Sequence, residues 1–311
     1  MKKTLLMLGA GMLLPVLLLF ISLVFPFAFL LVLPVMFAVS AALTVSGKPS
    51  LSIIYGVFTA IGALLLFSWF GAVIGVTCGI SGVYIGKSIL KKQNTKHTLL
   101  IASAGYGIIF LLCIVLCHAV YDINPITSLF NLMKDGVSAV LAQMPADALP
   151  YAELTETLRL TIDQLLEQMK LQFPSLLFSY AVLFGYISLW TIALLLHILK
   201  CAPFIPHFSR FKCTRATVWV FLISILGMFF NETDSVLGIV FMNIYAIVRF
   251  LLLACALSLA DYWMKTKKWH GVLRTLALWA LLFCSSTYFI SLILNLLALL
   301  DTRLNFRKLE D

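Results

Sequence analysis

Five glycines stand on one face of a long apolar segment that ends at Lys87. They are spaced by four, four, three and four residues: Gly71, Gly75, Gly79, Gly82 and Gly86. Residues at this spacing share one side of a helix, so the face is bare backbone. In a bilayer such a face lets a second helix approach closely, because helix association there depends on van der Waals packing. The pattern predicts a bundle of membrane helices, in which this face packs against another helix of the same chain. A seam between two copies of the chain is the alternative.

The composition and the charge distribution agree with a membrane protein. Hydrophobic residues make up 62% of the 311 residues, charged residues make up 11%, and the mean hydropathy is +1.06. A soluble domain carries roughly 25% charged residues. The net charge of +9 would suit a nucleic-acid partner, but most basic residues gather in short segments between apolar stretches, at 2–3, 48, 87–96, 200–215 and 265–274. This is the positive-inside distribution of cytoplasmic loops, so no nucleic acid is expected as a partner.

The apolar stretches predict about nine membrane spans, within a range of eight to ten, because a span needs roughly 20 apolar residues. Residues 4–45 and 51–86 are each long enough for two spans, the first broken near Pro26 and the second turning near 69–71. The other spans are expected at 98–120, 174–199, 216–230, 236–260 and 273–300. We therefore expect one all-α polytopic membrane domain over residues 1–311, with a cytoplasmic N-terminus. The first apolar stretch is too long for a cleaved signal peptide.

The C-terminal tail conflicts with this topology. Nine spans place the tail outside, although it contains Arg303, Arg307 and Lys308. Either a basic tail is tolerated outside, or one N-terminal segment is re-entrant and the remaining spans change direction. The sequence leaves both alternatives open.

An external insert is expected at residues 121–173, because this segment contains seven acidic residues and only three basic ones. Between 150 and 174, apolar residues recur at helical spacing, at Leu158, Ile162, Leu165, Leu166, Met169 and Phe173. This predicts an amphipathic helix, and residues 125–143 predict a second, weaker one. The insert could be a surface helix that connects two spans, or a lid over an outward-facing cavity.

Arg249 is the ionisable residue closest to the centre of a predicted span. An arginine at a helix centre costs at least ~2.5–3.5 kcal/mol on insertion scales, so its side chain must face protein, water or a ligand. Asn243 and Asn295 are candidate neighbours, as are Ser179 and Tyr180. The set Arg249, Asn243 and Asn295 is our candidate ligand-binding site. A structural role, with the arginine bonded to backbone carbonyls, is the alternative.

The sequence lacks the common signatures of soluble enzymes. It has no phosphate-binding loop, no zinc-protease motif and no serine-hydrolase motif. The seven cysteines form no close pair, so neither a disulfide framework nor a metal site is expected. We expect a non-enzymatic protein without cofactors.

The order of these features resembles the YybS family of predicted bacterial membrane proteins, a domain of unknown function. The similarity rests on the glycine helix, the basic loop from Lys200 to Arg215, and the ending Asp301-Thr302-Arg303-Leu304-Asn305-Phe306-Arg307-Lys308. It implies the plasma membrane of a Gram-positive bacterium. It also implies a fold-level likeness to the substrate-binding membrane subunits of energy-coupling-factor transporters.

Two functions remain open at this stage. The first is a transport-related binding or accessory subunit, which has no nucleotide site and needs an ATPase-coupled partner in the bilayer. The second is a scaffold that organises an envelope or sporulation complex through the glycine face.

Overall fold

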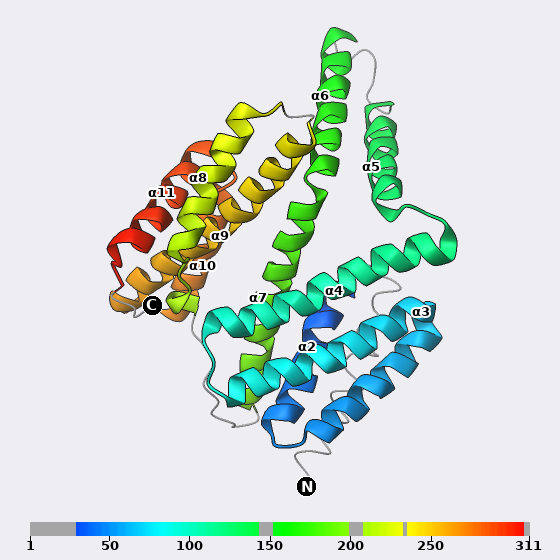
Figure 1. Cartoon of the computed structure of the whole chain (residues 1–311), viewed down its shortest axis with the longest axis vertical. Coiled ribbons are helices and arrows are strands. Elements are labelled where there is room, and N and C mark those ends of the chain that lie inside the picture. Colours follow the sequence, from blue (N-terminus) through cyan, green and yellow to red (C-terminus); the bar gives the residue numbers. More distant parts are fainter. Residues whose placement is uncertain (1–28, 143–151, 199–207, 233–234, 308–311) are drawn as a thin grey trace.

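A computed structural model describes residues 29–142, 152–198, 208–232 and 235–307, and every regular element within them is a helix (Figure 1). In chain order they are α2 (Phe29–Val45), α3 (Pro49–Leu90), α4 (Thr95–Tyr121), α5 (Pro125–Ala142), α6 (Ala152–Leu171), α7 (Phe173–Ile198), the short η3 (Phe208–Arg210), α8 (Arg215–Phe230), α9 (Val236–Thr266), α10 (Gly271–Cys284) and α11 (Tyr288–Leu304). The all-helical class is confirmed. The predicted first span and the break near Pro26 lie outside the described residues.

The helix α3 folds back on itself as two antiparallel arms. A Cβ built on Gly79 would lie 2.8 Å from the Cα of Gly56, and a Cβ built on Gly75 would lie 2.5 Å from the Cα of Ala60. A straight helix would separate Gly56 from Gly79 by roughly 35 Å. Figure 1 shows the two arms side by side, the first in blue and the second in light blue to cyan. The turn predicted within 51–86 is therefore confirmed.

The glycine face packs inside the chain. Gly75 and Gly79 meet the first arm of α3, whereas a Cβ on Gly82 or Gly86 would strike Ser40 or Thr44 of α2. Gly71 is buried as well. Ser40 strengthens this contact, since its hydroxyl donates a hydrogen bond of 2.9 Å to the carbonyl of Gly79. Small residues thus bring α2 and both arms of α3 together, as the spacing predicted.

Helices α4 and α7 complete an N-terminal group with α2 and α3. Tyr106 of α4 lies at its centre, fully buried, with its ring stacked on Phe37 at a centroid distance of 4.6 Å. Its hydroxyl lies 2.6 Å from the hydroxyl of Ser188 on α7. The polar contacts of this group are therefore made by neutral hydroxyls, which can be satisfied inside a bilayer at low cost.

Helices α8, α9, α10 and α11 form a C-terminal group, in which α9 is central and also contacts α7. The predicted ninth span at 273–300 is wrong as one continuous helix, because α10 and α11 are bent by 116° at residues 285–287. Near the start of α10, Arg274 pairs with Asp261 at 2.8 Å. Just beyond the end of α11, Arg307 donates to Ser258 at 2.8 Å. Both outer ends of the bent pair therefore contact the same end of α9.

The external insert forms two helices, α5 and α6, close to the predicted bounds. They pack on each other, and Lys134 of α5 forms an ion pair of 3.1 Å with Asp163 of α6. Only Gln172 separates α6 from α7, and Figure 1 shows α6 continuing away from the bundle along the direction of α7. The two helices pack on each other and on the helices α4 and α7, and the end of α6 also accepts a hydrogen bond from α9, at the carbonyl of Leu171. These contacts support a connecting insert and give no support to a lid.

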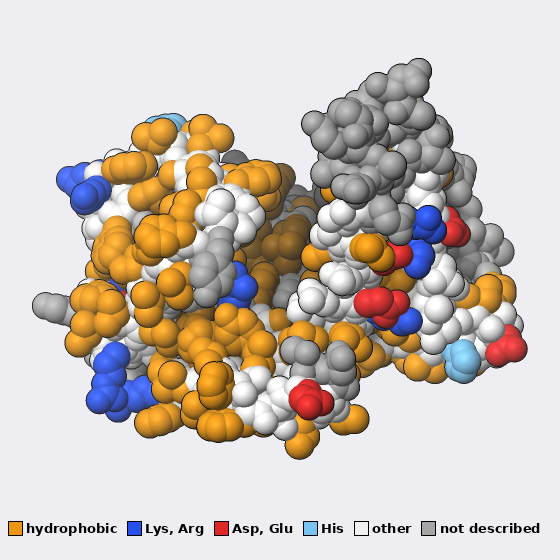
Figure 2. Space-filling model, turned by 90° about the horizontal axis from the view of Figure 1, so that it is seen from above, with side chains coloured by type: hydrophobic (Ala, Val, Ile, Leu, Met, Phe, Trp, Pro, Cys, Tyr) orange, Lys and Arg blue, Asp and Glu red, His pale blue; other side chains and the backbone are white. Residues whose placement is uncertain are grey.

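The exposed surface is strongly apolar, as a bilayer requires. Phe229 is 81% exposed and Phe283 is 74% exposed, and Figure 2 shows hydrophobic side chains over much of the visible face. Four segments are long and apolar enough to cross a membrane: Gly71–Leu90, Lys96–Tyr121, Phe173–Ile198 and Val236–Thr266. The bent pair α10 and α11 would count as a fifth, and the helices Val32–Val45, Pro49–Gly62 and Arg215–Phe230 are shorter. The chain is thus a multi-pass helical protein, while the predicted number of nine spans is not reached among the described residues.

Candidate functional site

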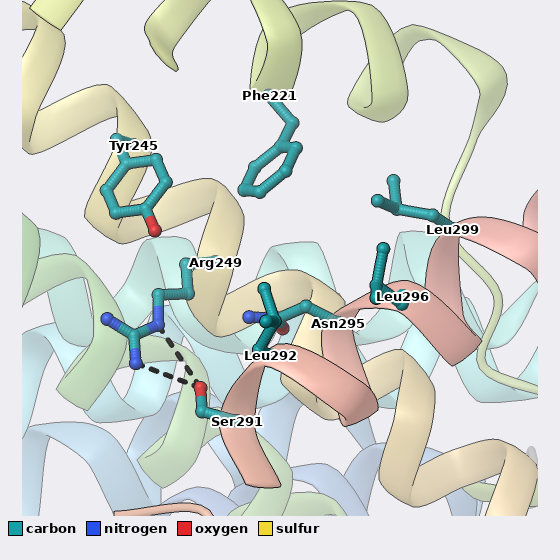
Figure 3. A pocket seen from close by; sticks show the side chains of 8 residues that line it. All are labelled: Phe221, Tyr245, Arg249, Ser291, Leu292, Asn295, Leu296 and Leu299. Atoms are coloured by element: carbon teal, nitrogen blue, oxygen red, sulfur yellow. Dashed lines mark hydrogen bonds between the residues drawn. The ribbon is translucent and has the colours of Figure 1, made fainter. Parts of the chain in front are cut away.

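Arg249 extends from the middle of α9 toward the first turn of α11. It lies roughly 20 Å along α9 from the first residue, at 1.5 Å per residue. The guanidinium donates two hydrogen bonds to the hydroxyl of Ser291, from Nη2 at 2.9 Å and from Nε at 3.3 Å (Figure 3). None of the ion pairs among the described residues involves Arg249. Within the described part of the chain, the guanidinium of Arg249 is therefore hydrogen-bonded to one neutral hydroxyl.

A cavity of about 40 Å³ lies beside Arg249, between α8, α9 and α11. It is lined by Phe221, Tyr245, Arg249, Ser291, Leu292, Asn295, Leu296 and Leu299. Figure 3 shows the polar groups of Tyr245, Arg249 and Ser291 at one side, with Phe221, Leu296 and Leu299 at the other. A water molecule needs roughly 10–15 Å³ when volume is measured in this way, so the cavity has room for a small polar species.

Asn295 lines this cavity and carries an unused hydrogen-bonding atom that is itself buried in the surrounding protein. Its side chain is 5% exposed, and the Oδ1 atom has no hydrogen-bond partner in the described part of the chain. A buried acceptor without a partner costs about 1–3 kcal/mol. The predicted pair Arg249 and Asn295 is therefore brought together, from α9 and α11, in the lining of one cavity.

Asn243, the third predicted ligand-binding residue, is used by the protein itself. Its Oδ1 accepts a hydrogen bond of 3.1 Å from the backbone N–H of Ser175, and its Nδ2 donates to the carbonyls of Leu171 and Ile239, both at 2.9 Å. These contacts join α9 to the end of α6 and to the start of α7. Asn243 thus holds three helices together, and it does not line the cavity.

Ser291, the partner of Arg249, was not among the predicted neighbours. Ser179 and Tyr180 were predicted instead, but Ser179 donates to the carbonyl of Ser175 within its own helix. The sequence did contain a signal for Ser291, because it precedes the predicted residue Asn295 by four positions and therefore shares its helix face.

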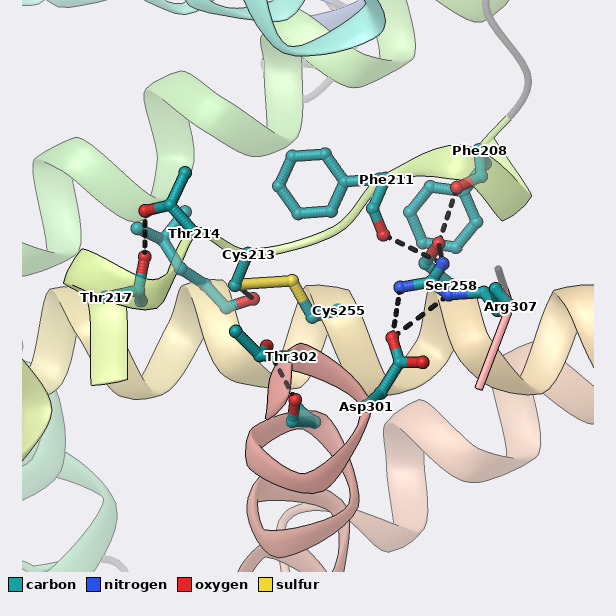
Figure 4. Close-up of a disulfide and its surroundings, with 12 residues drawn as sticks. Phe208, Phe211, Cys213, Thr214, Thr217, Cys255, Ser258, Asp301, Thr302 and Arg307 are labelled. Atoms are coloured by element: carbon teal, nitrogen blue, oxygen red, sulfur yellow. Dashed lines mark hydrogen bonds and ion pairs between the residues drawn. A yellow bond between two sulfur atoms is a disulfide. The ribbon is translucent and has the colours of Figure 1, made fainter. Parts of the chain in front are cut away.

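A second arginine, Arg307, is buried and shows what a fully hydrogen-bonded arginine looks like in this chain, whereas Arg249 is only partly buried. Arg307 is 3% exposed and forms a buried ion pair with Asp301, with Nη2 and Nε donating to Oδ2 at 2.6 and 3.0 Å (Figure 4). Its Nη1 donates to the carbonyls of Ser209 and Phe211 and to the hydroxyl of Ser258. The pair anchors the end of the chain against the segment before α8 and against α9.

A disulfide lies next to this anchor and corrects the expectation drawn from the cysteines. Cys213, just before α8, is bonded to Cys255 of α9, with a Cα–Cα distance of 6.2 Å (Figure 4). The two residues are 42 positions apart, so no spacing motif indicated the pair. Among the described residues, no group of three or more His, Cys, Asp and Glu side chains is arranged to hold a metal ion.

The fold and the site define a class: a multi-pass helical membrane protein with one incompletely paired arginine beside a small cavity. The comparison of sequences gives the family. The chain belongs to the family of predicted membrane proteins described as DUF2232, a domain of unknown function whose profile matches residues 4–302. No curated protein and no solved structure matches the chain.

Proposed function

We propose that this protein binds a small anionic ligand inside the membrane, as a transport-related binding or accessory subunit. The observation that carries this proposal is the contrast between Arg249 and Arg307. A guanidinium has five N–H donors. Those of Arg307 reach a carboxylate, two carbonyls and a hydroxyl, whereas the hydrogen bonds of Arg249 reach one hydroxyl. A negatively charged ligand in the adjacent cavity would supply the missing acceptors.

The alternative, a scaffold that assembles a complex through the glycine face, has less support. Gly75, Gly79, Gly82 and Gly86 all meet residues of their own chain. A scaffold would therefore need a different contact surface. The glycine face supports bundle stability and is not available to a partner.

Several finer expectations belong to the same proposal. They are the YybS-type resemblance, the likeness to energy-coupling-factor binding subunits, a Gram-positive plasma membrane, a cytoplasmic N-terminus and the absence of catalysis. A binding subunit that has no phosphate-binding loop depends on an ATPase-coupled partner for energy. Co-purification from native membranes tests this dependence. Recovery of an ATPase with an integral coupling subunit supports it, and recovery of envelope-assembly proteins favours the scaffold.

Thermal unfolding of the purified protein, with a panel of sodium salts of anionic metabolites, tests the binding itself. A ligand that binds only the folded state raises the unfolding temperature. We expect Arg249→Met to remove the increase, and Arg249→Lys to weaken binding roughly tenfold, because lysine lacks the planar fork. The matched control is Arg303→Met, at an exposed arginine near the end of α11. An increase that survives in Arg249→Met would exclude this site.

A further inference from the structure

The opening of the Arg249 cavity carries an inference that rests on the proposed function and specifies the class of its ligand. We propose that the ligand is a single-chain amphiphile with a carboxylate, such as a medium-chain fatty acid, which enters from the bilayer between α8 and α11. Its carboxylate binds Arg249, and its hydrocarbon chain extends out of the cavity between the two helices.

The cavity opens on the lateral surface of the helices. Leu292 and Leu296 line the cavity and are themselves 44% and 50% exposed, so the opening lies beside them on α11. Phe221 lines it from α8 (Figure 3). Leu296 is the middle residue of α11, and Phe221 is close to the middle of α8. The opening is therefore far from the helix ends, where a ligand from water would arrive.

The surface on both sides of the opening is apolar. Arg215 is the only charged residue of α8 and stands at its first position, while Asp301 and Arg303 of α11 stand close to its end. Acyl chains of the bilayer therefore lie against the opening, and a bare ion would have to cross them at high cost. The exposed side chains of the two helices between these charges include Leu222, Ile225, Ile293 and Leu300.

Arg249 supplies the binding group for the charged end of the ligand. The hydrogen bonds found for its guanidinium come from Nη2 and Nε, and both go to Ser291. None is found from Nη1 to any described residue. A carboxylate can accept two parallel hydrogen bonds from a guanidinium. Figure 3 shows the hydroxyl of Tyr245 on the same side of the cavity, where it is a further donor for such a group.

The size of the cavity selects a small charged group on a single chain. The volume is about 40 Å³, and a water molecule needs roughly 10–15 Å³ when volume is measured in this way. A carboxylate, with one carbon and two oxygens, fits this space. A phospholipid headgroup, with its glycerol and two chains, is too large. The chain of a fatty acid would pass Phe221, Leu296 and Leu299, which form the apolar side of the cavity.

Thermal unfolding of the full chain in lipid nanodiscs tests the ligand class. Decanoate has both the carboxylate and the chain, decanol has the chain alone, and acetate has the carboxylate without the chain. We expect decanoate to raise the unfolding temperature by at least about 2 °C relative to decanol, and acetate at the same concentration to have no measurable effect. Arg249→Met should reduce the effect of decanoate to that of decanol. Arg303→Met, the control, should behave as the wild type.

A second pair of variants tests the opening without changing any charge. Leu296→Trp places a larger side chain at the opening, and we expect it to weaken decanoate binding roughly tenfold. Ile293→Trp is the matched control, because Ile293 is 41% exposed on the same helix and does not line the cavity. Titration of the unfolding temperature against decanoate compares the two. Wild-type binding in Leu296→Trp would mean that the ligand does not use this opening.

Photocrosslinking locates the bound ligand. The probe is a fatty acid with a diazirine close to its carboxyl group, added to the full chain in lipid vesicles. We expect labelled peptides from α9 and α11, and loss of this label in Arg249→Met. Equal labelling of all lipid-facing helices, or labelling that is unchanged in Arg249→Met, would overturn the site.

The outcomes separate this inference from the proposed function. Equal effects of decanoate and decanol on the wild type would overturn the role of the carboxylate. If acetate acts as strongly as decanoate, or if a metabolite acts through Arg249 and decanoate does not, the amphiphile is wrong and the proposed function stands. No effect of any anion, including the metabolite panel, would remove both.

Discussion

The N-terminal and C-terminal groups of helices solve the same packing problem with different chemistry. In the N-terminal group, glycines allow close approach and neutral hydroxyls supply the polar contacts, as in the contact of Gly79 with Gly56 and the pair Tyr106 and Ser188. In the C-terminal group, charged residues connect the helices: Arg307 bonds Asp301 of α11 and Ser258 of α9, and Arg274 of α10 pairs with Asp261 of α9. These pairs lie at the end of α9 that leads into the basic segment 265–274, whereas Arg249 lies in the middle of α9, where a charge inside a membrane is costly.

The difference indicates a division of labour. A bundle held by small residues has one closely packed arrangement, because a backbone contact tolerates little displacement. A bundle held by charges depends on each partner being present, and Arg249 is the member whose partner set is incomplete. We therefore expect substitutions in the N-terminal group to affect stability alone, and substitutions around α9 and α11 to affect ligand binding as well.

The largest effect is expected from Arg307→Met. Removing one partner leaves the carboxylate of Asp301 buried and uncompensated, which typically costs about 3–5 kcal/mol. The double variant Asp301→Leu/Arg307→Met removes both charges and should recover much of this loss. Chemical or thermal unfolding of purified protein measures both. If the double variant is less stable than the single one, the stability lost in Arg307→Met comes mainly from the hydrogen bonds of Arg307 to the segment before α8. The buried charge of Asp301 would then not be the main cause.

The next largest effect is expected from Gly79→Leu, in the N-terminal group. The new side chain would have to occupy space already filled by the backbone at Gly56, and overpacking of this kind costs roughly 1–3 kcal/mol. The control is Gly107→Leu on α4, since a Cβ there meets nothing within 4 Å. Unfolding temperatures in detergent compare the two. Equal stability of Gly79→Leu and wild type would mean that the arms of α3 are not packed on each other.

The fold was predictable from the sequence to the extent that it depends on local pattern. The glycine spacing identified the close contacts of α3, and the apolar periodicity identified α6. The bend between α10 and α11 was missed, although the polar residues Ser285, Ser286 and Thr287 interrupt the apolar stretch at the bend. The contacts with α9 are what show the reversal. Polarity alone does not distinguish a straight span from a hairpin of the same composition.

The candidate site was predictable in part. Arg249 was identified because a charge at the centre of a span is costly, and Asn295 followed as a polar residue at similar depth. Asn243 is also a polar residue within a predicted span, but its side chain is hydrogen-bonded to the backbone of Leu171 and Ser175 and does not reach Arg249's cavity. Its position relative to Ser175 depends on how α7 and α9 pack, which a single sequence does not determine. The disulfide between Cys213 and Cys255 was missed for the same reason.

A smaller effect is expected from Tyr106→Phe. The variant keeps the ring stacked on Phe37 and loses the hydroxyl bonded to Ser188. Hydrogen bonds between membrane helices contribute about 0.6 kcal/mol on average, so the loss should be near this value and ligand binding should not change. Tyr180→Phe, at a tyrosine on α7 that is 54% exposed, is the control. A change in anion affinity in Tyr106→Phe would contradict the division of labour between the two groups.

The smallest effect is expected from Lys134→Met, in the external insert. Lys134 and Asp163 connect α5 to α6, but their side chains are 52% and 32% exposed, so water and salt screen the attraction. Exposed ion pairs contribute at most about 1 kcal/mol, and we expect a few tenths here. The loss should shrink further as the salt concentration is raised, whereas the loss in Arg307→Met should persist, because the pair with Asp301 is buried. Unfolding at low and high salt compares the two, and an effect of Lys134→Met that resists salt would mean that the insert is shielded by a surface such as the lipid headgroups.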